Sequence, residues 1–397
     1  MIKNNKIFRI VLTGGGSGGH TFPLIAVLRK IKQLSQDRNL PIEVIYVGPN
    51  DFTLNYIKKE GIEIKPLTTG KIRRSLNPFD ILNNFLDIFK TIIGIFQAII
   101  YLYLIMPDLV FSKGGFGSFP VVFSSIIFFI PLYLHESDAE VGLANRLSLK
   151  FCRKIFVSFE NTLNFLPANK VKLVGNPIRE ELFYKEEIDK VSLKKSLGID
   201  EKRPLLTILG GSLGAQHIND LILDSLPRLI EELEIIHQTG ENDYERVKRE
   251  ADIVFKEIIG SEINKGFYHI LPFIEENLTM KGVFNLKDIY FLSDLIVSRA
   301  GSGLIFEIAQ SGKPSIIIPI PYSPKDHQRK NAYEYQKSGA AVVIEEKNLQ
   351  PNIFVDLVFQ IIKDEKKKKE MGESALKFAK PNASLEIAEE LISSLSL

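Results

Sequence analysis

The stretch FRIVLTGGGSGGHTFP at residues 8–23 decides the fold. Its first part, Phe8–Thr13, is a short apolar run, and a helical pattern extends over Pro23–Ser35. Between them, Gly14 to His20 include five glycines, which let a backbone come close to a bound phosphate. A strand, a glycine turn and a helix in this order are typical of nucleotide-binding βα units, because the helix N-terminus offers N–H groups to an anion.

Short apolar runs of this kind recur through the chain. The first half continues with Glu43–Val47, Asp108–Ser112, Leu132–Leu134, Lys154–Ser158 and Val171–Val174. The second half restarts at Leu205–Leu209 and continues with Leu233–Gln238, Tyr268–Leu271, Leu295–Ser298 and Ser315–Pro319. Near-continuous apolar strands that alternate with helices predict parallel sheets covered on both faces. The predicted fold class is therefore α/β, with two doubly wound, Rossmann-like domains.

The domain boundaries follow from length and from this restart. A chain of 397 residues exceeds what one ordinary core supports, so two domains are expected. We place the first at residues 1–175 and the second at residues 176–380. Residues 381–397 have a helical pattern, and we expect this helix to pack back on the first domain.

Composition and charge indicate the compartment and the partners. The single cysteine, Cys152, excludes an intramolecular disulfide and fits a reducing compartment. The N-terminal residues lack the long apolar run of a signal peptide, so we expect a cytoplasmic protein. Residues 1–175 hold 21 Lys and Arg against 12 Asp and Glu, a balance of +9, and the remainder holds 29 against 36, a balance of −7. This asymmetry favours an anionic partner for the first half, either nucleic acid or anionic lipid.

Two apolar stretches bear on membrane contact. Ile92–Met106 contains Gln97, and Phe119–Leu134 contains two prolines. A membrane-spanning helix needs about 20 uninterrupted apolar residues. We therefore expect both stretches to form buried helices or strands, and neither to cross a membrane.

Two further glycine loops lie in the second half. Gly210–Ala215 follows a strand, and Ser298–Glu307 runs from another strand through a Gly-Ser-Gly turn into a helix. Backbone amides at such a helix start suit a diphosphate, and a carboxylate in the early turns suits both hydroxyls of a ribose. An ordinary turn followed by a solvent-facing Glu307 would explain the same residues.

The first glycine loop also has the spacing of a dinucleotide-binding motif. A nicotinamide cofactor would need an acidic residue at the end of the second strand, to bind its ribose hydroxyls. Asp37 lies in a polar loop and Glu43 opens that strand instead of ending it. The oxidoreductase interpretation is weakened accordingly.

Ten segments together resemble the MurG family, the peptidoglycan N-acetylglucosaminyltransferases among the GT-B glycosyltransferases. In chain order they are GGGSGGHTFP (14–23), GKIRR (70–74), FSKGGFGSFP (111–120), HESDAEVGLANR (135–146), VGNPIREEL (174–182), GGSLGAQHIND (210–220), HQTGEND (237–243), LPFIEEN (271–277), SDLIVSRAGSGLIFEIAQSGKPSIIIPIP (293–321) and DHQRKNA (326–332).

The resemblance implies two Rossmann-like domains that face each other across a cleft. It implies an inverting transfer of N-acetylglucosamine from UDP-N-acetylglucosamine to the C4 hydroxyl of the muramyl sugar of lipid I, which gives lipid II for peptidoglycan synthesis. The second domain would hold the donor, and the first would take the acceptor as a peripheral protein on the cytoplasmic face of the cell membrane. We also expect contact with a wall-synthesis and division complex, and no nucleic-acid partner.

The resemblance assigns site residues one by one. Glu307 would bind the ribose, the turn from Ser302 the diphosphate, Ile274 the uracil and Gln328 the sugar. The donor-binding residues expected in full are Ser17, Gly18, Gly19, Arg179, Ser212, Ile274, Ser302, Gly303, Leu304, Glu307 and Gln328. Those expected on the acceptor and membrane side are Gly15, Gly16, Lys71, Arg73, Arg74, Phe79, Gly114 and Gly115.

Inversion implies one direct displacement, which needs a general base and stabilisation of the leaving UDP. His20 is the first candidate base and Glu136 the second. Helix dipoles and loop amides can carry the charge of UDP, and no Asp-x-Asp element lies at a glycine turn. We therefore expect no cofactor and no metal requirement.

Two features depart from the family. His135-Glu-Ser-Asp138 stands where the family commonly has His-Glu-Gln-Asn, and an ionised Asp accepts hydrogen bonds but cannot donate them. The stretch Thr279–Phe291 is also longer than usual, and we interpret Met280–Leu286 as an inserted loop near the donor.

A basic cluster lies next to apolar residues in the first half. Lys71, Arg73 and Arg74 precede Leu76, Phe79, Leu82 and Phe85, which recur at helical spacing. This arrangement suits docking to an anionic lipid surface, and the apolar Phe119–Ile130 is a second candidate for lipid contact. Closure of the first domain's core by both helices is the competing interpretation.

Three alternatives to the main prediction remain. One is a GT-B transferase that uses a UDP-sugar on a different membrane lipid, which His135–Arg146 and Asp326–Ala332 disfavour. Another is a nicotinamide-dependent oxidoreductase, and the last is a non-catalytic scaffold. A scaffold would have no need to keep both His20 and Glu307.

Overall fold

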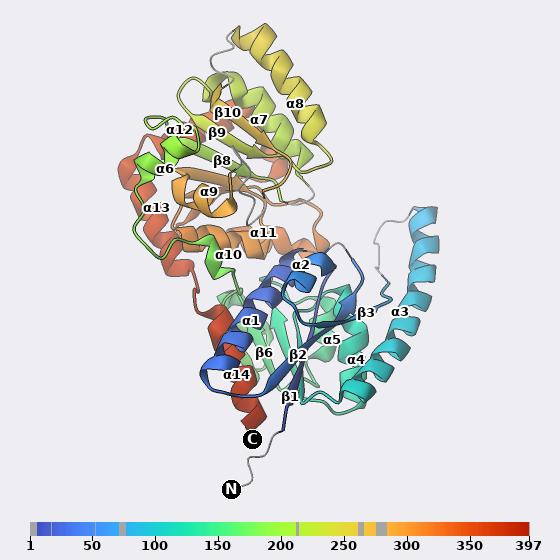
Figure 1. Cartoon of the computed structure of the whole chain (residues 1–397). Helices are drawn as coiled ribbons and strands as arrows, with labels where there is room; N and C mark the ends of the chain where they lie inside the picture. Colours follow the sequence, from blue (N-terminus) through green and yellow to red (C-terminus); the bar gives the residue numbers. More distant parts are fainter. Residues whose placement is uncertain are drawn as a thin grey trace. The chain divides into compact units, whose positions relative to one another are not determined.

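The computed structural model describes residues 6–16, 18–51, 53–70, 77–211, 214–260, 266–274 and 284–396. The chain divides into two compact units (Figure 1). Unit 1 contains the residues up to Arg179 together with those from Lys380, and unit 2 is Glu180–Ala379. Each unit is built on one sheet whose neighbouring strands all run parallel.

Unit 1 has a seven-stranded sheet in the order β3-β2-β1-β4-β5-β6-β7. Its strands are β1 Phe8–Thr13, β2 Ile42–Pro49, β3 Glu63–Leu67, β4 Leu109–Ser112, β5 Leu132–Glu136, β6 Lys154–Val157 and β7 Val171–Leu173. Its helices are α1 Gly18–Asp37, α2 Leu54–Lys59, α3 Pro78–Ile105, α4 Phe119–Ile127, α5 Leu143–Ser148 and α14 Ala383–Ser393, with short helices η1 Phe116–Ser118, η2 Glu160–Phe165 and η8 Ser394–Ser396.

Alternating side chains of these strands fill two cores. Ile10 and Leu12 of β1 pack in a cluster with α1 and α14, whereas Val11 packs with α3 and α4 on the opposite face. This is the two-residue period of a strand whose faces are both covered. The C-terminal helix α14 thus belongs to unit 1, where it packs against α1.

Unit 2 has a six-stranded sheet in the order β10-β9-β8-β11-β12-β13. Its strands are β8 Leu205–Leu209, β9 Glu234–Gln238, β10 Tyr268–Leu271, β11 Leu295–Ser298, β12 Ser315–Ile317 and β13 Ala341–Val343. Its helices are α6 Lys190–Ser196, α7 Gln216–Leu229, α8 Tyr244–Ile253, α9 Leu286–Leu292, α10 Ser302–Ser311, α11 His327–Lys337, α12 Pro351–Ile362 and α13 Glu365–Phe378. Short helices are η3 Glu180–Leu182, η4 Val254–Ile259, η6 Pro324–Asp326 and η7 Glu346–Asn348.

Strand order reverses between β1 and β4 in unit 1, and between β8 and β11 in unit 2. In doubly wound sheets, ligands bind outside the carboxyl ends of the strands at such a reversal. All four of these strands run directly into loops that the sequence analysis selected. The prediction of two doubly wound α/β domains is confirmed, and the topology locates the binding edge of each sheet.

Some element boundaries differ from the prediction. Helix α1 begins at Gly18 instead of Pro23, so that Gly18 and Gly19 lie in its first turn. The strands β3 and β13, which both lie at sheet edges, were missed. β3 is half polar and partly exposed, which leaves little apolar signal, and β13 has only three residues. Helix α9 begins at Leu286, within the segment interpreted as an inserted loop, and residues 279–283 lie outside the described residues.

The expectation that Ile92–Met106 is buried is wrong. It is the second half of α3, a helix of 28 residues in which Asp87 is paired with Lys90. Only 22% of the window Leu82–Ile105 is buried. By length and composition this is the one helix among the described residues that could cross a membrane.

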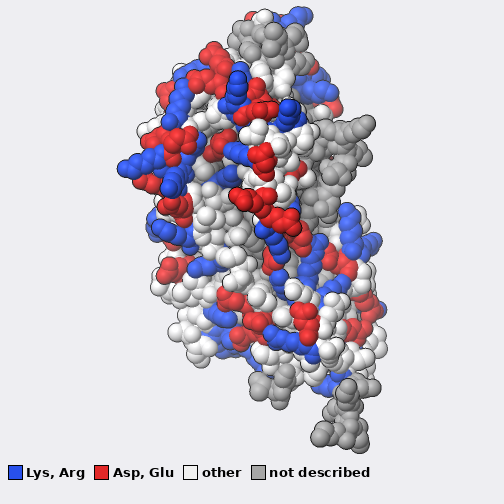
Figure 2. Space-filling model, turned by 60° about the vertical axis from the view of Figure 1, so that its left-hand side comes forward, with Lys and Arg blue, Asp and Glu red and all other residues white. Residues whose placement is uncertain are grey.

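Acidic residues of α14 partly offset the basic excess of the first half of the chain. Glu386, Glu389 and Glu390 form ion pairs with Lys172, Arg38 and Lys154. On the face shown in Figure 2, Lys and Arg are interspersed with Asp and Glu. The sequence asymmetry therefore does not appear on this face as a field of one sign.

Candidate functional site

Two glycine loops of unit 1 meet at the carboxyl ends of β1 and β4. Gly16 has a φ of +90°, and a Cβ there would lie 2.4 Å from the ring of Phe116. Gly115 has a φ of +84°, and its Cβ would lie 3.0 Å from the carbonyl oxygen of Gly15. Both positions therefore require glycine, and the structure brings the predicted residues Gly15, Gly16 and Gly115 together.

His20 lies in the first turn of α1, beside the second of these loops. A Cβ on Gly115 would lie 3.1 Å from its Cδ2 and 3.2 Å from its Nε2. The imidazole is half-buried, so one side of the ring is packed and the side chain remains accessible. Gly18 and Gly19 share the same first turn. His20 is thus a partly accessible imidazole at the strand-order reversal of unit 1.

The amide of Gly16 already has an anionic partner. Its N–H donates to Oδ2 of Asp51, at 2.7 Å. The hydroxyl of Tyr46 donates to the carbonyl of Gly14 at 2.6 Å, and burial together with the charge of Asp51 raises the pKa of Tyr46. Asp51 follows β2 and was missed by sequence reasoning. The loop is therefore held by internal hydrogen bonds, and the N–H of Gly16 donates to Asp51 instead of to a phosphate.

Glu136 ends β5 at the same edge and is 5% exposed. Its carboxylate accepts from the N–H of Asp138 at 3.2 Å, of Gly142 at 2.8 Å, and from Nδ2 of Asn145 at 2.9 Å. Burial and the charge of Asp138 raise the pKa of Glu136, although these donors oppose the shift. With three donors bound, Glu136 organises the loop after β5, and His20 is the more accessible candidate base.

In unit 2 the corresponding edge carries Glu307. This residue lies on α10, is 8% exposed, and accepts a hydrogen bond on Oε2 from the hydroxyl of Tyr290 at 2.8 Å. Ser302, Gly303 and Leu304 form the first turn of the same helix, where N–H groups have no partner within the helix. The amides of this turn could bind a diphosphate, and the carboxylate of Glu307 could bind the ribose of the same nucleoside diphosphate.

Tyr290 is a residue that the sequence analysis did not select. It belongs to α9, is 1% exposed, and stacks on Phe183 with ring centroids 5.9 Å apart. It lies in Thr279–Phe291, the segment for which the sequence predicts an inserted loop near the donor but no site residue. No local pattern links it to Glu307, because the contact depends on how α9 and α10 pack.

The remaining predicted residues are placed as follows. Ile274 is buried after β10. Gln328 lies in the first turn of α11 and accepts on Oε1 from the N–H of Ile320 at 3.1 Å. Arg179 is the last residue of unit 1 before unit 2 begins, with its guanidinium 4.2 Å from the ring centroid of Phe22. Gly114 follows β4 and has a φ of +81°. Ser17, Lys71, Arg73, Arg74 and Ser212 lie outside the described residues.

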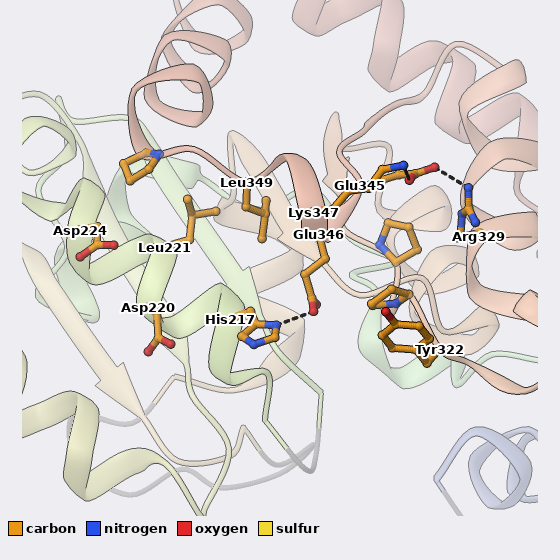
Figure 3. A pocket seen from close by; sticks show the side chains of 13 residues that line it. His217, Asp220, Leu221, Asp224, Tyr322, Arg329, Glu345, Glu346, Lys347 and Leu349 are labelled. Atoms are coloured by element: carbon orange, nitrogen blue, oxygen red, sulfur yellow. Dashed lines mark hydrogen bonds and ion pairs between the residues drawn. The ribbon is translucent and has the colours of Figure 1, made fainter. Parts of the chain in front are cut away.

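A pocket of about 620 Å³ in unit 2 is lined by none of the described residues predicted to bind the donor (Figure 3). Figure 3 shows His217 directed at Glu346 and Arg329 at Glu345. Glu346 also pairs with Arg299 at 2.5 Å. Because Arg299 precedes the turn into α10, Glu346 connects the start of α7 to that turn.

Helix α3 presents a continuous apolar face to solvent. It packs on α4 and β3, and its exposed side chains include Phe79, Leu82, Phe85, Phe89, Ile93, Phe96, Ile100, Tyr103 and Leu104. Their spacing of three and four residues places them along one side of the helix. Phe129, which follows α4, is also 92% exposed. These residues form what we call the α3 apolar face.

Helix α3 is also tightly attached to the rest of unit 1. The Oε1 of Gln97 accepts from the N–H of Thr68 at 2.8 Å. A Cβ on Gly94 would lie 2.1 Å from the carbonyl oxygen of Thr68, and one on Gly70 would lie 1.9 Å from that of Asp87. Backbone contacts this close hold one side of α3 against residues 67–70.

Among the described residues, no three His, Cys, Asp or Glu side chains are grouped so that they could hold a metal ion. The chemistry available at the two edges is that of an imidazole, buried carboxylates and helix-start amides. Such groups can move a proton and bind an anion.

Family models match both halves of the chain. The Glycosyltransferase family 28 N-terminal domain matches residues 10–157, and the Glycosyltransferase family 28 C-terminal domain matches residues 205–387. Two relatives bear the name UDP-N-acetylglucosamine–N-acetylmuramyl-(pentapeptide) pyrophosphoryl-undecaprenol N-acetylglucosamine transferase. The one from Clostridium tetani is 35% identical over 93% of this chain and 94% of its own. The one from Bacillus cereus strain ATCC 10987, numbered 2, is 33% identical over 93% and 94%.

Solved structures share the fold. MurG of Acinetobacter baumannii matches with a TM-score of 0.71 and 24% identity, over 97% of this chain and 99% of that chain. The UDP complex of MnaA from S. aureus matches with a TM-score of 0.65 and 15% identity, over 98% of both chains. At these identities the likeness concerns the fold alone.

Proposed function

The chain belongs to glycosyltransferase family 28, and we propose that it transfers N-acetylglucosamine from UDP-N-acetylglucosamine to the muramyl sugar of lipid I, giving lipid II. The observation that carries this proposal is the match, over 93% of the chain, to relatives named for this transfer. The site geometry supports it, since each sheet carries candidate residues after a strand at its order reversal. These are Gly16 and Gly115 in unit 1, and Ser302 and Glu307 in unit 2.

Unit 2 is the proposed donor side. Glu307 accepts hydrogen bonds from the two ribose hydroxyls, and the first turn of α10 binds the diphosphate through its amides. Ile274 meets the uracil through its backbone, and Gln328 contacts the sugar. Tyr290 orients the carboxylate of Glu307 through the hydrogen bond that its hydroxyl donates to Oε2.

Unit 1 is the proposed acceptor side. The C4 hydroxyl of the muramyl sugar attacks C1 of N-acetylglucosamine while the bond from C1 to the diphosphate oxygen breaks. The hydroxyl proton passes to the imidazole of His20, and UDP leaves with the bonding electron pair. Inversion at C1 follows from this single displacement. Donors at the start of α10 stabilise the charge that develops on UDP.

Radiolabel transfer from UDP-N-acetylglucosamine to a lipid I analogue tests the function. We expect a product with the mobility of lipid II. Equal or faster transfer to an unrelated membrane lipid, such as diacylglycerol, would favour the alternative that the chain glycosylates a different lipid. Absence of transfer to either acceptor would contradict an enzymatic role.

We propose that transfer needs no metal ion and no cofactor. Helix-start amides and dipoles supply positive potential where the diphosphate leaves, which is the task that a divalent cation performs in other transferases. The initial rate should therefore be the same in excess EDTA as in Mg²⁺. A rate that falls in EDTA and returns with Mg²⁺ would refute this.

The α3 apolar face is the proposed contact with the membrane. Its attachment to residues 67–70 favours a helix that lies in the lipid interface over one that spans the bilayer. Each Phe that moves from water into lipid contributes about 1.5–3 kcal/mol. Phe85→Ser together with Phe96→Ser should therefore weaken liposome binding at least about tenfold in a flotation assay.

The matched control is Ile253→Ser together with Ile353→Ser in unit 2. These two side chains are 53% and 56% exposed, which is close to the 58% of Phe85 and the 62% of Phe96. This pair should float like the wild type. Vesicles with anionic lipid should bind more protein than neutral ones, through Lys71, Arg73 and Arg74, at about 1 kcal/mol for each basic residue. Equal loss of liposome binding in the two double variants would contradict the apolar contact through α3. Equal binding to anionic and neutral vesicles would contradict the electrostatic contribution.

A further inference from the structure

Lys113 is a buried cation that the proposed mechanism does not use. It follows β4 directly, is 1% exposed, and its Nζ contacts three side chains. These are Nδ1 of His135 at 2.8 Å, Oγ of Ser137 at 2.7 Å and Oδ1 of Asn176 at 3.0 Å. An ammonium has three N–H donors, so these partners satisfy all of them.

These contacts fix the tautomer of His135. Its Nε2 lies 2.9 Å from the carbonyl oxygen of Gly175, an acceptor only, so Nε2 carries the hydrogen. Nδ1 then accepts from Lys113. Burial, followed by the charge of Lys113, lowers the pKa of His135 well below its usual value, and the ring stays neutral. His135 is thereby engaged in holding Lys113 and is not available as a base.

Two carboxylates compensate the charge of Lys113. Burial lowers the pKa of Lys113 to about 7, and the charges of Glu136 and Asp138 oppose that shift. Glu136 ends β5, and Asp138 lies in the loop after it, two residues beyond. Besides these two, the titratable groups that act on the cluster are His135 of β5 and His20 of α1. The cluster thus contains one cation and two carboxylates, and Lys113 offsets part of their negative charge.

Lys113 contacts two loops of unit 1, the loop after β4 and the loop after β5. It directly precedes Gly114 and Gly115, the loop that lies against His20. Through Ser137 it holds the segment that leads from Glu136 to Asp138. Removing the ammonium of Lys113 should therefore alter the conformation of both loops. The ammonium itself is too buried to touch a substrate.

We propose that Lys113 is a positioning residue for the acceptor, whose ammonium ties the loop after β4 to the loop after β5 and balances the charge of Asp138. The inference rests on the proposed function, in which unit 1 binds the acceptor. It predicts an effect on acceptor kinetics that is coupled to Asp138 and absent from donor kinetics.

The first test is a double-mutant cycle in the full-length protein. Lys113→Met should lower kcat/KM for the lipid I analogue about 10- to 100-fold and leave KM for UDP-N-acetylglucosamine unchanged, because the buried Glu136 and the half-buried Asp138 then lack their counter-ion. Lys113→Met combined with Asp138→Asn should recover at least threefold of that loss. Additive effects, or a rise in donor KM equal to the loss on the acceptor side, would overturn the proposal.

The second test is the pH profile of acceptor kcat/KM. The protonated amine is the positioning form, so kcat/KM should fall as pH rises through the pKa of Lys113. Asp138→Asn removes a charge that favours the protonated form, and should move this alkaline limb to lower pH. Lys113→Met should lack the limb. An alkaline limb that is the same in all three proteins would contradict the proposal.

The third test does not use activity. In ¹⁵N-histidine NMR spectra, with His135→Gln as the assignment control, wild-type His135 should appear as the Nε2-protonated tautomer. Lys113→Met keeps the Gly175 carbonyl, so Nε2 should stay protonated, but the Nδ1 resonance should shift because Nδ1 loses the hydrogen bond from Lys113. Ser137→Ala removes a single partner and serves if Lys113→Met fails to fold, with an expected acceptor loss of about three- to tenfold. If the wild type transfers no sugar, the proposed function fails. If it transfers sugar but the Nδ1 resonance of His135 and the acceptor kcat/KM are unchanged in the variants, this inference alone fails.

Discussion

His20→Ala should lower kcat for sugar transfer by about 10²- to 10⁴-fold while UDP binding stays at the wild-type level, because a positioned general base contributes about this much. The imidazole is the partly accessible base at the strand-order reversal of unit 1, whereas the carboxylate of Glu136 is bound by three donors. Single-turnover transfer from radiolabelled donor to the lipid I analogue measures the chemical step directly.

The control for this experiment is His217→Ala. His217 lies in unit 2, its side chain is 65% exposed, and it pairs with Glu346 at the pocket of Figure 3. Its removal should leave kcat within about threefold of the wild type, since surface pairs contribute little. A loss below about tenfold in His20→Ala would rule out His20 as the base. In that case Glu136→Gln is the next variant to test.

The positions of the binding loops could be predicted from the sequence because they follow from covalent order. A strand that runs into glycines and then into a helix places those glycines at the carboxyl edge of a parallel sheet. Gly14–Gly16 and Gly301–Glu307 occupy such edges in the two units. The edge strand β3 was missed because its Glu-Ile-Lys-Pro-Leu sequence lacks a continuous apolar run.

Lipid contact was predicted for Phe79, Leu82 and Phe85 at the start of α3, but the exposure of its second half could not be predicted from composition. An apolar helix in a core and an apolar helix that faces lipid have similar amino-acid compositions. Only the packing of α3 against α4 and β3 shows which of its faces is exposed. Long-range partners were missed for a similar reason. The bonds from Gly16 to Asp51, from Tyr290 to Glu307 and from Lys113 to Asn176 join residues far apart in the chain. No spacing rule in the sequence brings them together.

Glu307→Gln should weaken UDP binding at least about 100-fold, measured by titration calorimetry on the full-length protein. Hydrogen bonds to a charged group contribute about 1.5–3 kcal/mol each, and a carboxylate can accept from both ribose hydroxyls. An amide keeps the shape of Glu307 but has only one acceptor oxygen and no charge. Unchanged UDP affinity would remove Glu307 from the donor site, and with it the assignment of the start of α10 to the diphosphate.

Tyr290→Phe separates the position of Glu307 from its charge. The variant removes one hydroxyl that donates to Oε2 and keeps the ring that stacks on Phe183, so UDP affinity should fall about three- to tenfold. Tyr268→Phe is the matched control, because it removes a buried hydroxyl of the same unit that is 2.7 Å from Nδ1 of His237. Both variants lose one buried hydrogen bond and should have similar melting temperatures. Only Tyr290→Phe should bind UDP more weakly, since only its hydroxyl acts on the carboxylate that accepts the ribose; equal affinities in the two variants would show that Tyr290 only supports the core.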